Sequence, residues 1–358
     1  MAITAAMVKE LREMTGAGMM DCKKALTETN GDMDAAVEVL KKSGAAKMEK
    51  KASRIAAEGI ARVAASDTVA VVVEVNSETD FVAKNETFQE FVQVVADNAL
   101  ASGLEGGTNG EDVEAVLEMN GLKDLLVEKT ATIGEKLSVR RFARVTGECV
   151  ASYIHAGGKI GVLVAATGAS DDTAKDALSN IAMQIAAMNP KYISRADIPN
   201  EEIEKMREIT IDSALNDPAS LPKPIQNELY TKVETENLFS EEDLAILNEK
   251  KNDKYLYNFL SKEAIAKLAE LALAGKAAYV DNKIFAGLVE GRISKHIKEI
   301  SLLEQVYVKA EDGKQTVAKY LESVNKDLAI AKFVRFEVGE GMEKKNEDFA
   351  AEVAAQLG

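Results

Sequence analysis

The folding pattern of this chain is clearest around the stretch Glu74-Val75-Asn76-Ser77-Glu78-Thr79-Asp80-Phe81-Val82-Ala83-Lys84-Asn85. Residues 69–73 before it are typical of a strand, and apolar residues recur at helical spacing over 88–99. Thr79 or Asp80 is therefore suited to cap the first amides of a helix. Phe81 lies outside the apolar stripe of that helix. The stretch is either a helix cap alone or an exposed aromatic that enters another molecule's pocket.

Charge and cysteine content narrow the functional class. The 358 residues include 44 basic and 59 acidic side chains, a net charge of -15, which argues against a general binder of nucleic acid or membrane surfaces. Cys22 and Cys149 form no CxxC pair. This disfavours a disulfide framework or a zinc site and suits a reducing cytoplasm. No signal peptide and no membrane span are expected from the apolar pattern.

Residues 4–44 predict three short helices. Thr4 is placed to cap the first helix, and the glycines of 16–18 interrupt it. Asp32 is placed to cap the third helix, and Gly44 is expected to end it. About forty residues bury little surface, so these helices predict a small satellite bundle.

The two methionines that open the second helix have different expected roles. By helical spacing Met19 shares the buried face of Cys22 and Leu26 and is expected in the core. Met20 points away from that face and is the better contact residue, because methionine adapts to irregular partner surfaces. After the bundle comes a basic linker with Lys47, Lys50, Lys51 and Arg54.

An internal repeat organises residues 58–340. Each copy has two strands joined by a turn, then a helix and later a third strand. The strands are expected at 59–63, 69–75 and 141–145 in the first copy, and at 150–155, 160–166 and 332–336 in the second.

Aligned without gaps, Thr79-Asp80 falls on Ser170-Asp171. Both copies then place a hydroxyl and a carboxylate before their helix, which favours the capping role. The next pair differs, because Phe81-Val82 of the first copy falls on Asp172-Thr173 of the second. A cap does not require this difference, so it marks where a function is expected.

A mostly helical segment, residues 198–300, interrupts the second copy. It is too long for one compact repeat to absorb and predicts a projecting helical hairpin or small bundle. The segment is either a solvated arm or a means of self-association through helix faces, and the sequence leaves both open. Residues 347–357 predict a short terminal helix that docks on this chain or a partner.

The sequence predicts no enzyme, cofactor site or metal site. It contains neither a phosphate-binding GxxxxGK[ST] loop nor a GxGxxG after a strand. His155 and His296 lie in patterns that favour structural or solvated roles. Cys22 on an apolar helix face suits a buried, inert thiol.

Four segments resemble signatures of the bacterial elongation factor Ts family. They are LREMTGAGMMDCKKAL at 11–26, TDFVAK at 79–84, YIHAGGKIGV at 153–162 and FEVGEG at 336–341. They occur in family order, and the resemblance covers nearly the whole chain apart from roughly 217–280, which looks additional to the shorter members. The family often has an apolar pair near 306–309, which Lys309 interrupts.

The resemblance implies an α+β fold in five parts. A UBA-like bundle of three helices with the basic linker forms 1–54. Two repeated subdomains, each with a three-stranded antiparallel sheet and helices, form 55–148 and then 149–190 with 301–341. A helical arm of dimerisation type is inserted at 191–300 and enlarged at about 217–280. A C-terminal helix module follows at 342–358.

The resemblance also implies a function in translation elongation. Family members are cytoplasmic guanine-nucleotide exchange factors that bind elongation factor Tu, GDP-bound or nucleotide-free, without direct contact to nucleic acid or membrane. A homodimer through the arm is a further expectation. The residues implied to disturb the partner's magnesium and phosphate site are Thr79, Asp80, Phe81 and Val82. Those implied to bind from the bundle are Arg12, Met19 and Met20, with weaker contacts from His155, Gly157, Gly158 and Val308.

Two other functions stay open. One is an adaptor that binds a small protein through the N-terminal bundle, with the core as a passive scaffold. The other is an enzyme that uses Asp80 and His155 as an acid–base pair. The lack of a third orienting group or cofactor motif disfavours the enzyme.

Overall fold

The computed structural model describes residues 3–343 and confirms a mixed α+β fold with two antiparallel sheets. The chain divides into two compact units. One unit runs to Asn189 and resumes at Val306, and the other is Pro190–Gln305. The terminal helix expected at 347–357 lies outside the described residues.

Three N-terminal helices form the predicted bundle: α1 (Ala5–Thr15), α2 (Met19–Glu28) and α3 (Met33–Lys51). The Thr4 hydroxyl accepts from the amide of Met7, and the Asp32 carboxylate accepts from the amide of Ala35, so both predicted caps are confirmed. The bundle core consists of Val8, Leu11, Cys22, Ala25, Leu26 and Ala36. Burial raises the pKa of the Cys22 thiol, as expected for an inert cysteine.

The prediction that Gly44 ends the third helix is wrong. Gly44 is buried inside α3, where the helix packs on α7 (Leu122–Ile133). A Cβ at Gly44 would lie 3.0 Å from Cγ1 of Val127, so the missing side chain permits a close approach of the two helices. In this chain the glycine serves interhelical packing rather than a C-cap.

The two sheets reproduce the repeat in register. The first has the order β1-β2-β4-β3, and the second β5-β6-β7. Their strands are β1 (Glu58–Ala65), β2 (Val69–Ser77), β3 (Gly106–Gly107), β4 (Ser138–Thr146), β5 (Cys149–His155), β6 (Ile160–Thr167) and β7 (Ala329–Glu337). Each central strand has one register shift, at Glu74/Val75 and at Ala165/Ala166, and the ungapped alignment superposes Glu74 on Ala165. The expectation of three strands per sheet missed β3, whose two residues are too short to show a strand pattern.

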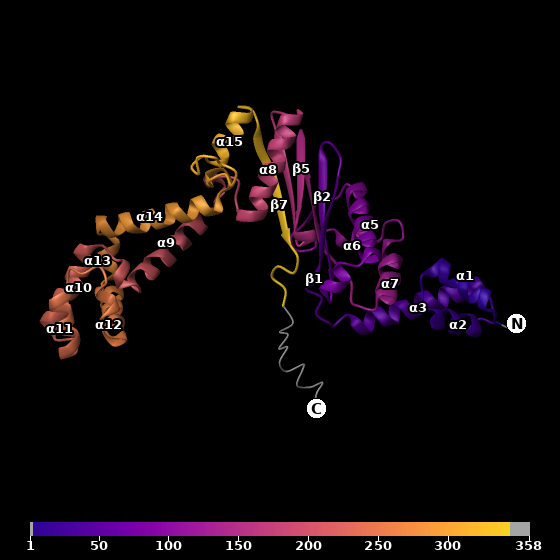
Figure 1. Ribbon diagram of the computed structural model, residues 1–358, viewed down its shortest axis with the longest axis horizontal. Helices are drawn as coiled ribbons and strands as arrows, with labels where there is room; N and C mark the ends of the chain where they lie inside the picture. The colour runs from indigo at the N-terminus through magenta and orange to yellow at the C-terminus, as the bar shows by residue number, and fades with distance from the viewer. Residues whose placement is uncertain (1–2, 344–358) are drawn as a thin grey trace. The chain divides into compact units, whose positions relative to one another are not determined.

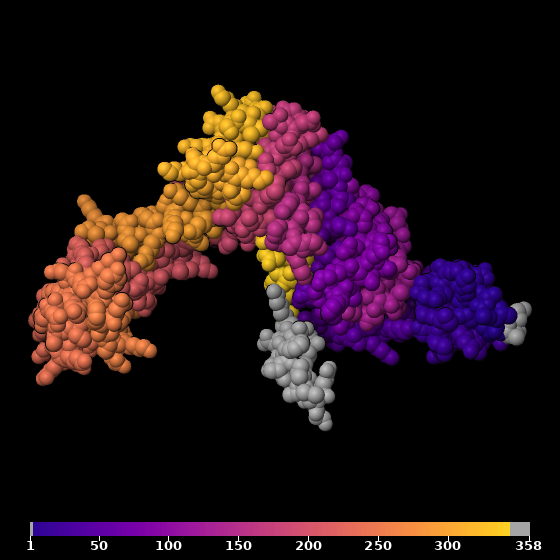
Figure 2. All heavy atoms as spheres, viewed as in Figure 1, coloured from indigo at the N-terminus to yellow at the C-terminus, as the bar shows by residue number. Residues whose placement is uncertain are grey.

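The sheets pack face to face, mainly through alanine and valine side chains together with Leu163 and Phe336, and helices lie on the outer faces (Figure 1). A Cβ on Gly161 of β6 would lie 2.7 Å from Cγ2 of Val72 on β2, which shows how closely the sheets approach. The outer face of the first sheet bears α5 (Glu86–Ser102), α6 (Val113–Leu117) and α7. The second sheet bears α8 (Asp172–Met188), with α15 (Val317–Val324) against it (Figures 1 and 2).

The unit Pro190–Gln305 is helical. It contains α9 (Asn200–Leu215), α10 (Lys223–Glu236), α11 (Glu241–Lys250), α12 (Lys262–Ala274), α13 (Lys276–Val280) and α14 (Lys283–Ile300). Within the segment expected to be helical, α12 begins at Lys262, where the Ser261 hydroxyl caps it by accepting from the amide of Ala264. The ends of the unit are tied, since the Lys191 amide donates to the Ile300 carbonyl at 2.9 Å.

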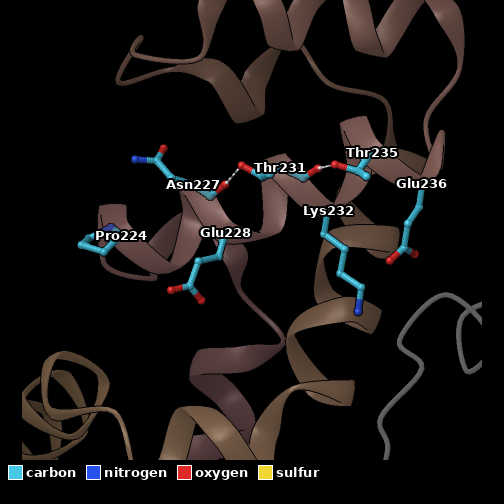
Figure 3. Close-up of a pocket in the computed structure, with 7 residues that line it drawn as sticks. All are labelled: Pro224, Asn227, Glu228, Thr231, Lys232, Thr235 and Glu236. Carbon is cyan, nitrogen blue, oxygen red and sulfur yellow. Dashed lines mark hydrogen bonds between the residues drawn. The ribbon is translucent and has the colours of Figure 1, made fainter.

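The outward face of α10 forms a shallow groove of 510 Å³ (Figure 3). The hydroxyls of Thr231 and Thr235 donate to carbonyls of their own helix, which leaves mainly charged side chains of both signs facing solvent. The lining comes from this one helix and carries no predicted site residue.

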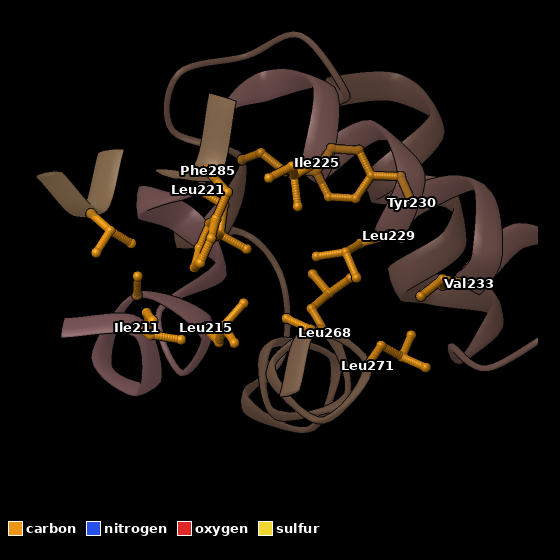
Figure 4. Packing of buried hydrophobic residues seen from close by; sticks show 14 of the residues in the cluster. Ile211, Leu215, Leu221, Ile225, Leu229, Tyr230, Val233, Leu268, Leu271 and Phe285 are labelled. Atoms are coloured by element: carbon orange, nitrogen blue, oxygen red, sulfur yellow. The ribbon is translucent and has the colours of Figure 1, made fainter. Parts of the chain in front are cut away.

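Residues 217–280 are not a separate addition to the arm. Leu229 of α10 and Leu268 of α12 belong to the same buried cluster as Leu215 of α9 and Phe285 of α14 (Figure 4). Helices α10 and α12, from residues 217–280, and the flanking helices α9 and α14 therefore share one hydrophobic core. The homodimer expected from this arm stays a prediction.

Candidate functional site

The stretch after β2 forms an extra helical turn. The one-turn helix α4 (Asp80–Ala83) follows the strand, and α5 begins only after Asn85. The Thr79 hydroxyl accepts from the amide of Val82 at 3.3 Å and so caps α4. The long helix is capped by Asn85, whose Oδ1 accepts from the amide of Phe88 at 3.2 Å. The prediction that Thr79 or Asp80 caps the long helix is therefore wrong, although Thr79 is a cap.

The second copy has no such turn. Asp171 follows β6 after residues 168–170 and caps α8 directly, with Oδ1 accepting from the amide of Ala174 at 2.8 Å. Between β2 and the Asn85 cap lie residues 78–84. The ungapped equivalence of Asp80 and Asp171 is therefore wrong at this point. Asp171 matches Asn85 in role, and α4 is an insertion in the first copy.

Phe81 projects from this inserted turn and is 80% exposed. Val82 is partly buried against the core of the first sheet and its helices, and Ala83 is buried in that core. The two residues fix the inner side of α4, while Phe81 occupies its outer side. The expected exposure of Phe81 is confirmed.

Asp80 carries a charge beside Phe81. Its Oδ2 lies 2.7 Å from Nζ of Lys84, whose side chain is largely exposed, while that of Asp80 is about half exposed. The hydrogen bond from Lys84 is the main cause that holds the pKa of Asp80 below its usual value, and the charge of Lys159 adds to it. The carboxylate is therefore ionised and partly neutralised by a flexible lysine.

Glu135 and Lys136, which the sequence did not single out, hold the residues just before α4. Glu135, in the loop after α7, accepts from the amides of Glu78 and Thr79, each at 3.0 Å, and from the Thr79 hydroxyl at 2.7 Å. Glu78 in return accepts from the amide of Lys136 at 2.6 Å. These partners are more than fifty residues apart in sequence, so no local pattern could reveal them.

The N-terminal bundle presents methionines to solvent. Met20 is 75% exposed, Met19 is 59% exposed and Arg12 is exposed. The expectation that Met19 is buried is wrong: Met19 is the first residue of α2, and helical side chains lean back toward the N-terminus, here beyond the helix end. Met14 is also 59% exposed, although the sequence did not indicate it as a contact candidate.

The turn between β5 and β6 contains the next predicted contacts. His155 is exposed, with Nδ1 3.1 Å from the Tyr153 hydroxyl. Gly157 is exposed, whereas Gly158 is buried with φ 103° against Ile60 of β1. Gly158 can therefore act on a partner only through the shape of the turn.

Val308 lies on a loop fixed by Gln184 of α8. The Val308 amide donates to Oε1 of Gln184 at 2.7 Å, and the Gln184 amide group donates to the Val306 carbonyl. Val306 and Val308 are about half exposed and flank Tyr307. The Tyr307 ring stacks on that of Tyr320, with 4.0 Å between the ring centroids. An exposed apolar pair thus exists at 306 and 308, although Lys309 binds Asn180 instead.

The described residues set two further limits. Within 3–343, no group of three or more histidine, cysteine or acidic side chains is arranged to hold a metal ion. No helix in that part of the chain combines the length and apolar character of a membrane span.

Comparison with known proteins identifies the family. A sequence model described as Elongation factor TS matches residues 78–340. Elongation factor Ts of Clostridioides difficile (strain 630) is 43% identical over 366 aligned positions that cover 99% of each chain. This relative is therefore of comparable length. The chain belongs to the elongation factor Ts family of translation elongation factors.

Proposed function

We propose that this chain releases GDP from elongation factor Tu by inserting α4 beside the partner's magnesium and phosphate site. Family membership supports a nucleotide exchange factor for elongation factor Tu. The observation that carries the mechanism is an 80% exposed phenylalanine on a turn anchored from below. Phe81 enters the partner as an aromatic anchor, and the Asp80 carboxylate disturbs the charge balance around the magnesium ion.

An exchange factor of this kind performs no chemical step. It accelerates GDP release by binding the nucleotide-free partner more tightly than the GDP-bound partner, and the coupling between factor and nucleotide is reciprocal. Arg12, Met19 and Met20 would bind the same domain of the partner. His155, Gly157, Gly158 and Val308 would add weaker contacts.

Stimulated release of a fluorescent GDP analogue from elongation factor Tu tests the proposal. Phe81→Ala is expected to slow it at least tenfold, because interface aromatics often contribute about 2 kcal/mol and about 1.4 kcal/mol is a factor of ten. The unfolding free energy of the free protein should change by less than about 0.5 kcal/mol, as for a surface residue. Phe259→Ala, which truncates a 49% exposed phenylalanine of the helical unit, is the matched control.

The opposite result for Phe81→Ala, a large loss of stability with normal exchange, would contradict the proposed mechanism. A core phenylalanine costs about 3–5 kcal/mol on truncation. Unchanged exchange together with such a loss would make Phe81 an ordinary packing residue.

The exposed methionines of the bundle favour one alternative, an adaptor that binds a small protein through α1 and α2. In that case Met20→Gln would abolish capture of the partner, whereas Phe81→Ala would change neither capture nor exchange. A loss of exchange in Phe81→Ala would exclude a passive core.

A further inference from the structure

The Glu135 carboxylate accepts three hydrogen bonds from two consecutive residues of the α4 base. Oε2 accepts from the amides of Glu78 and Thr79, and Oε1 accepts from the Thr79 hydroxyl. These amides lie between the end of β2 at Ser77 and the start of α4 at Asp80. Neither the strand ladder nor the helix supplies them with an acceptor, so Glu135 does.

The third of these bonds sets the direction of the cap. An ionised carboxylate is only an acceptor, so the Thr79 hydroxyl must donate its proton to Glu135. Its lone pairs are then available to the amide of Val82, which lies 3.3 Å from Oγ1. Glu135 therefore orients the hydroxyl that begins the turn from which Phe81 projects.

The loop that carries Glu135 is itself held. The Lys136 amide donates to Oε1 of Glu78, so residues 78 and 135–136 bind each other in both directions. Nζ of Lys136 donates to the carbonyls of Ala52 and Arg54 at 2.7 and 2.9 Å. The support of α4 is thus a fixed structure rather than a single surface contact.

The corresponding junction of the second copy has a simpler support. There Glu148 accepts one hydrogen bond, from the amide of Gly168 at 2.8 Å, just beyond β6. One carboxylate bond suffices where the strand leads directly to a capped helix. The first copy has three where an exposed turn must hold its shape.

We propose that Glu135 is a positioning residue for nucleotide exchange, holding α4 so that Phe81 is presented to the partner in a fixed geometry. This rests on the proposed function. Order in the free protein reduces the entropy lost on binding, so a loosened turn weakens the anchor even when the phenylalanine is present. Glu135→Ala should slow stimulated GDP release about tenfold, and Glu135→Gln, which keeps one carbonyl acceptor, should slow it less.

A double-mutant cycle with Phe81→Ala tests this on the full chain with elongation factor Tu and fluorescent GDP. If Glu135 acts through Phe81, Glu135→Ala adds less than twofold to the defect in the Phe81→Ala background. A structural role alone would give multiplicative defects. Glu148→Ala is the matched control, because it removes the corresponding carboxylate at the other junction, and it should leave the rate unchanged.

The outcomes separate the two proposals. If Phe81→Ala slows release and Glu135→Ala does not, or if their defects multiply, the positioning role is overturned and the proposed function stands. If Phe81→Ala itself has no effect, the proposed mechanism fails. Should Glu135→Ala fail to give a cooperative melt, the same cycle run with Glu135→Gln decides, since multiplicative defects there overturn the role equally.

Discussion

The two strand-to-helix junctions of the repeat start from the same architecture and end differently. After β6, residues 168–170 lead straight to Asp171, which caps α8. After β2, residues 78–84 form an additional turn before Asn85 caps α5. The strands around them agree even in the position of the register shift. The difference between the junctions therefore lies in residues 78–84, which contribute only Val82 and Ala83 to the packing of the core and leave Phe81 exposed.

The largest effect is expected when this difference is removed. Replacing residues 78–84 by the sequence Gly168-Ala169-Ser170 should reduce stimulated GDP release by more than tenfold, because Asp80 and Phe81 are lost together. The protein should still melt cooperatively, at a lower temperature, since the buried Ala83 and the packing of Val82 are lost as well. Fluorescent-GDP release and circular-dichroism melting measure the two quantities. A folded variant with the short junction and normal exchange would show that residues 78–84 are not required for GDP release.

The repeat could be predicted from sequence because strand periodicity is local. The β-branched apolar run over 69–73 and its counterpart from 160 identified both central strands, and their alignment survives in the structure. The alignment failed at Asp80 because capping residues resemble one another: threonine, aspartate and asparagine all accept from a helix amide. Asn85, three residues before Phe88, was the available sign of a second helix start.

Other features lay beyond sequence reasoning for physical reasons. Gly44 has the sequence context of a helix stop, and only the close approach of Val127 shows why a glycine is buried there. Glu135 is one acidic residue among 59 in the chain. Its role depends on the fold bringing the loop after α7 to residues 78–79. The exposure of Phe81 was predictable, but the support beneath it was not.

The next effect is on stability alone and tests whether Asn85 and Asp171 are equivalent as helix caps. Asp171→Ala and Asn85→Ala should each lower the unfolding free energy by about 1 kcal/mol, the usual contribution of an N-cap. Urea denaturation measures this. Asp171→Ala should leave GDP release unchanged, because the second junction presents no anchor. A tenfold loss of exchange in Asp171→Ala would show that the second junction also participates.

A smaller effect on stability is expected for Asp80→Ala. Asp80 is not a cap, and its ion pair with Lys84 is largely exposed, so its loss should cost less than that of the Thr79 cap in Thr79→Ala. Denaturation of the two variants side by side measures the difference. If Asp80→Ala proves the more destabilising, its effect on exchange cannot be assigned to partner contact.

The smallest expected effect is a change in the pKa of Asp80. The hydrogen bond from Lys84 is the largest of the causes that lower this pKa in the folded protein. A carboxyl with a lowered folded pKa contributes stability above its unfolded pKa of about 3.9, and this contribution is lost as the pH falls through the folded value. Lys84→Met should therefore raise the pKa of Asp80 toward its ordinary value. Wild type and variant should differ slightly in stability above about pH 4 and converge in more acidic solution.

Carboxyl chemical shifts followed through an acid titration by NMR measure this pKa directly. Glu111 provides the internal control, because its pKa is lowered by backbone and Asn109 hydrogen bonds that Lys84 does not touch. Glu111 should titrate identically in both proteins, whereas Asp80 should shift. The weaker influence of Lys159 remains in the variant, so the pKa of Asp80 should stay somewhat below the value of a free aspartate. An unchanged Asp80 would mean that Lys84 does not neutralise this carboxylate in solution, and that Asp80 meets the partner as an unpaired charge.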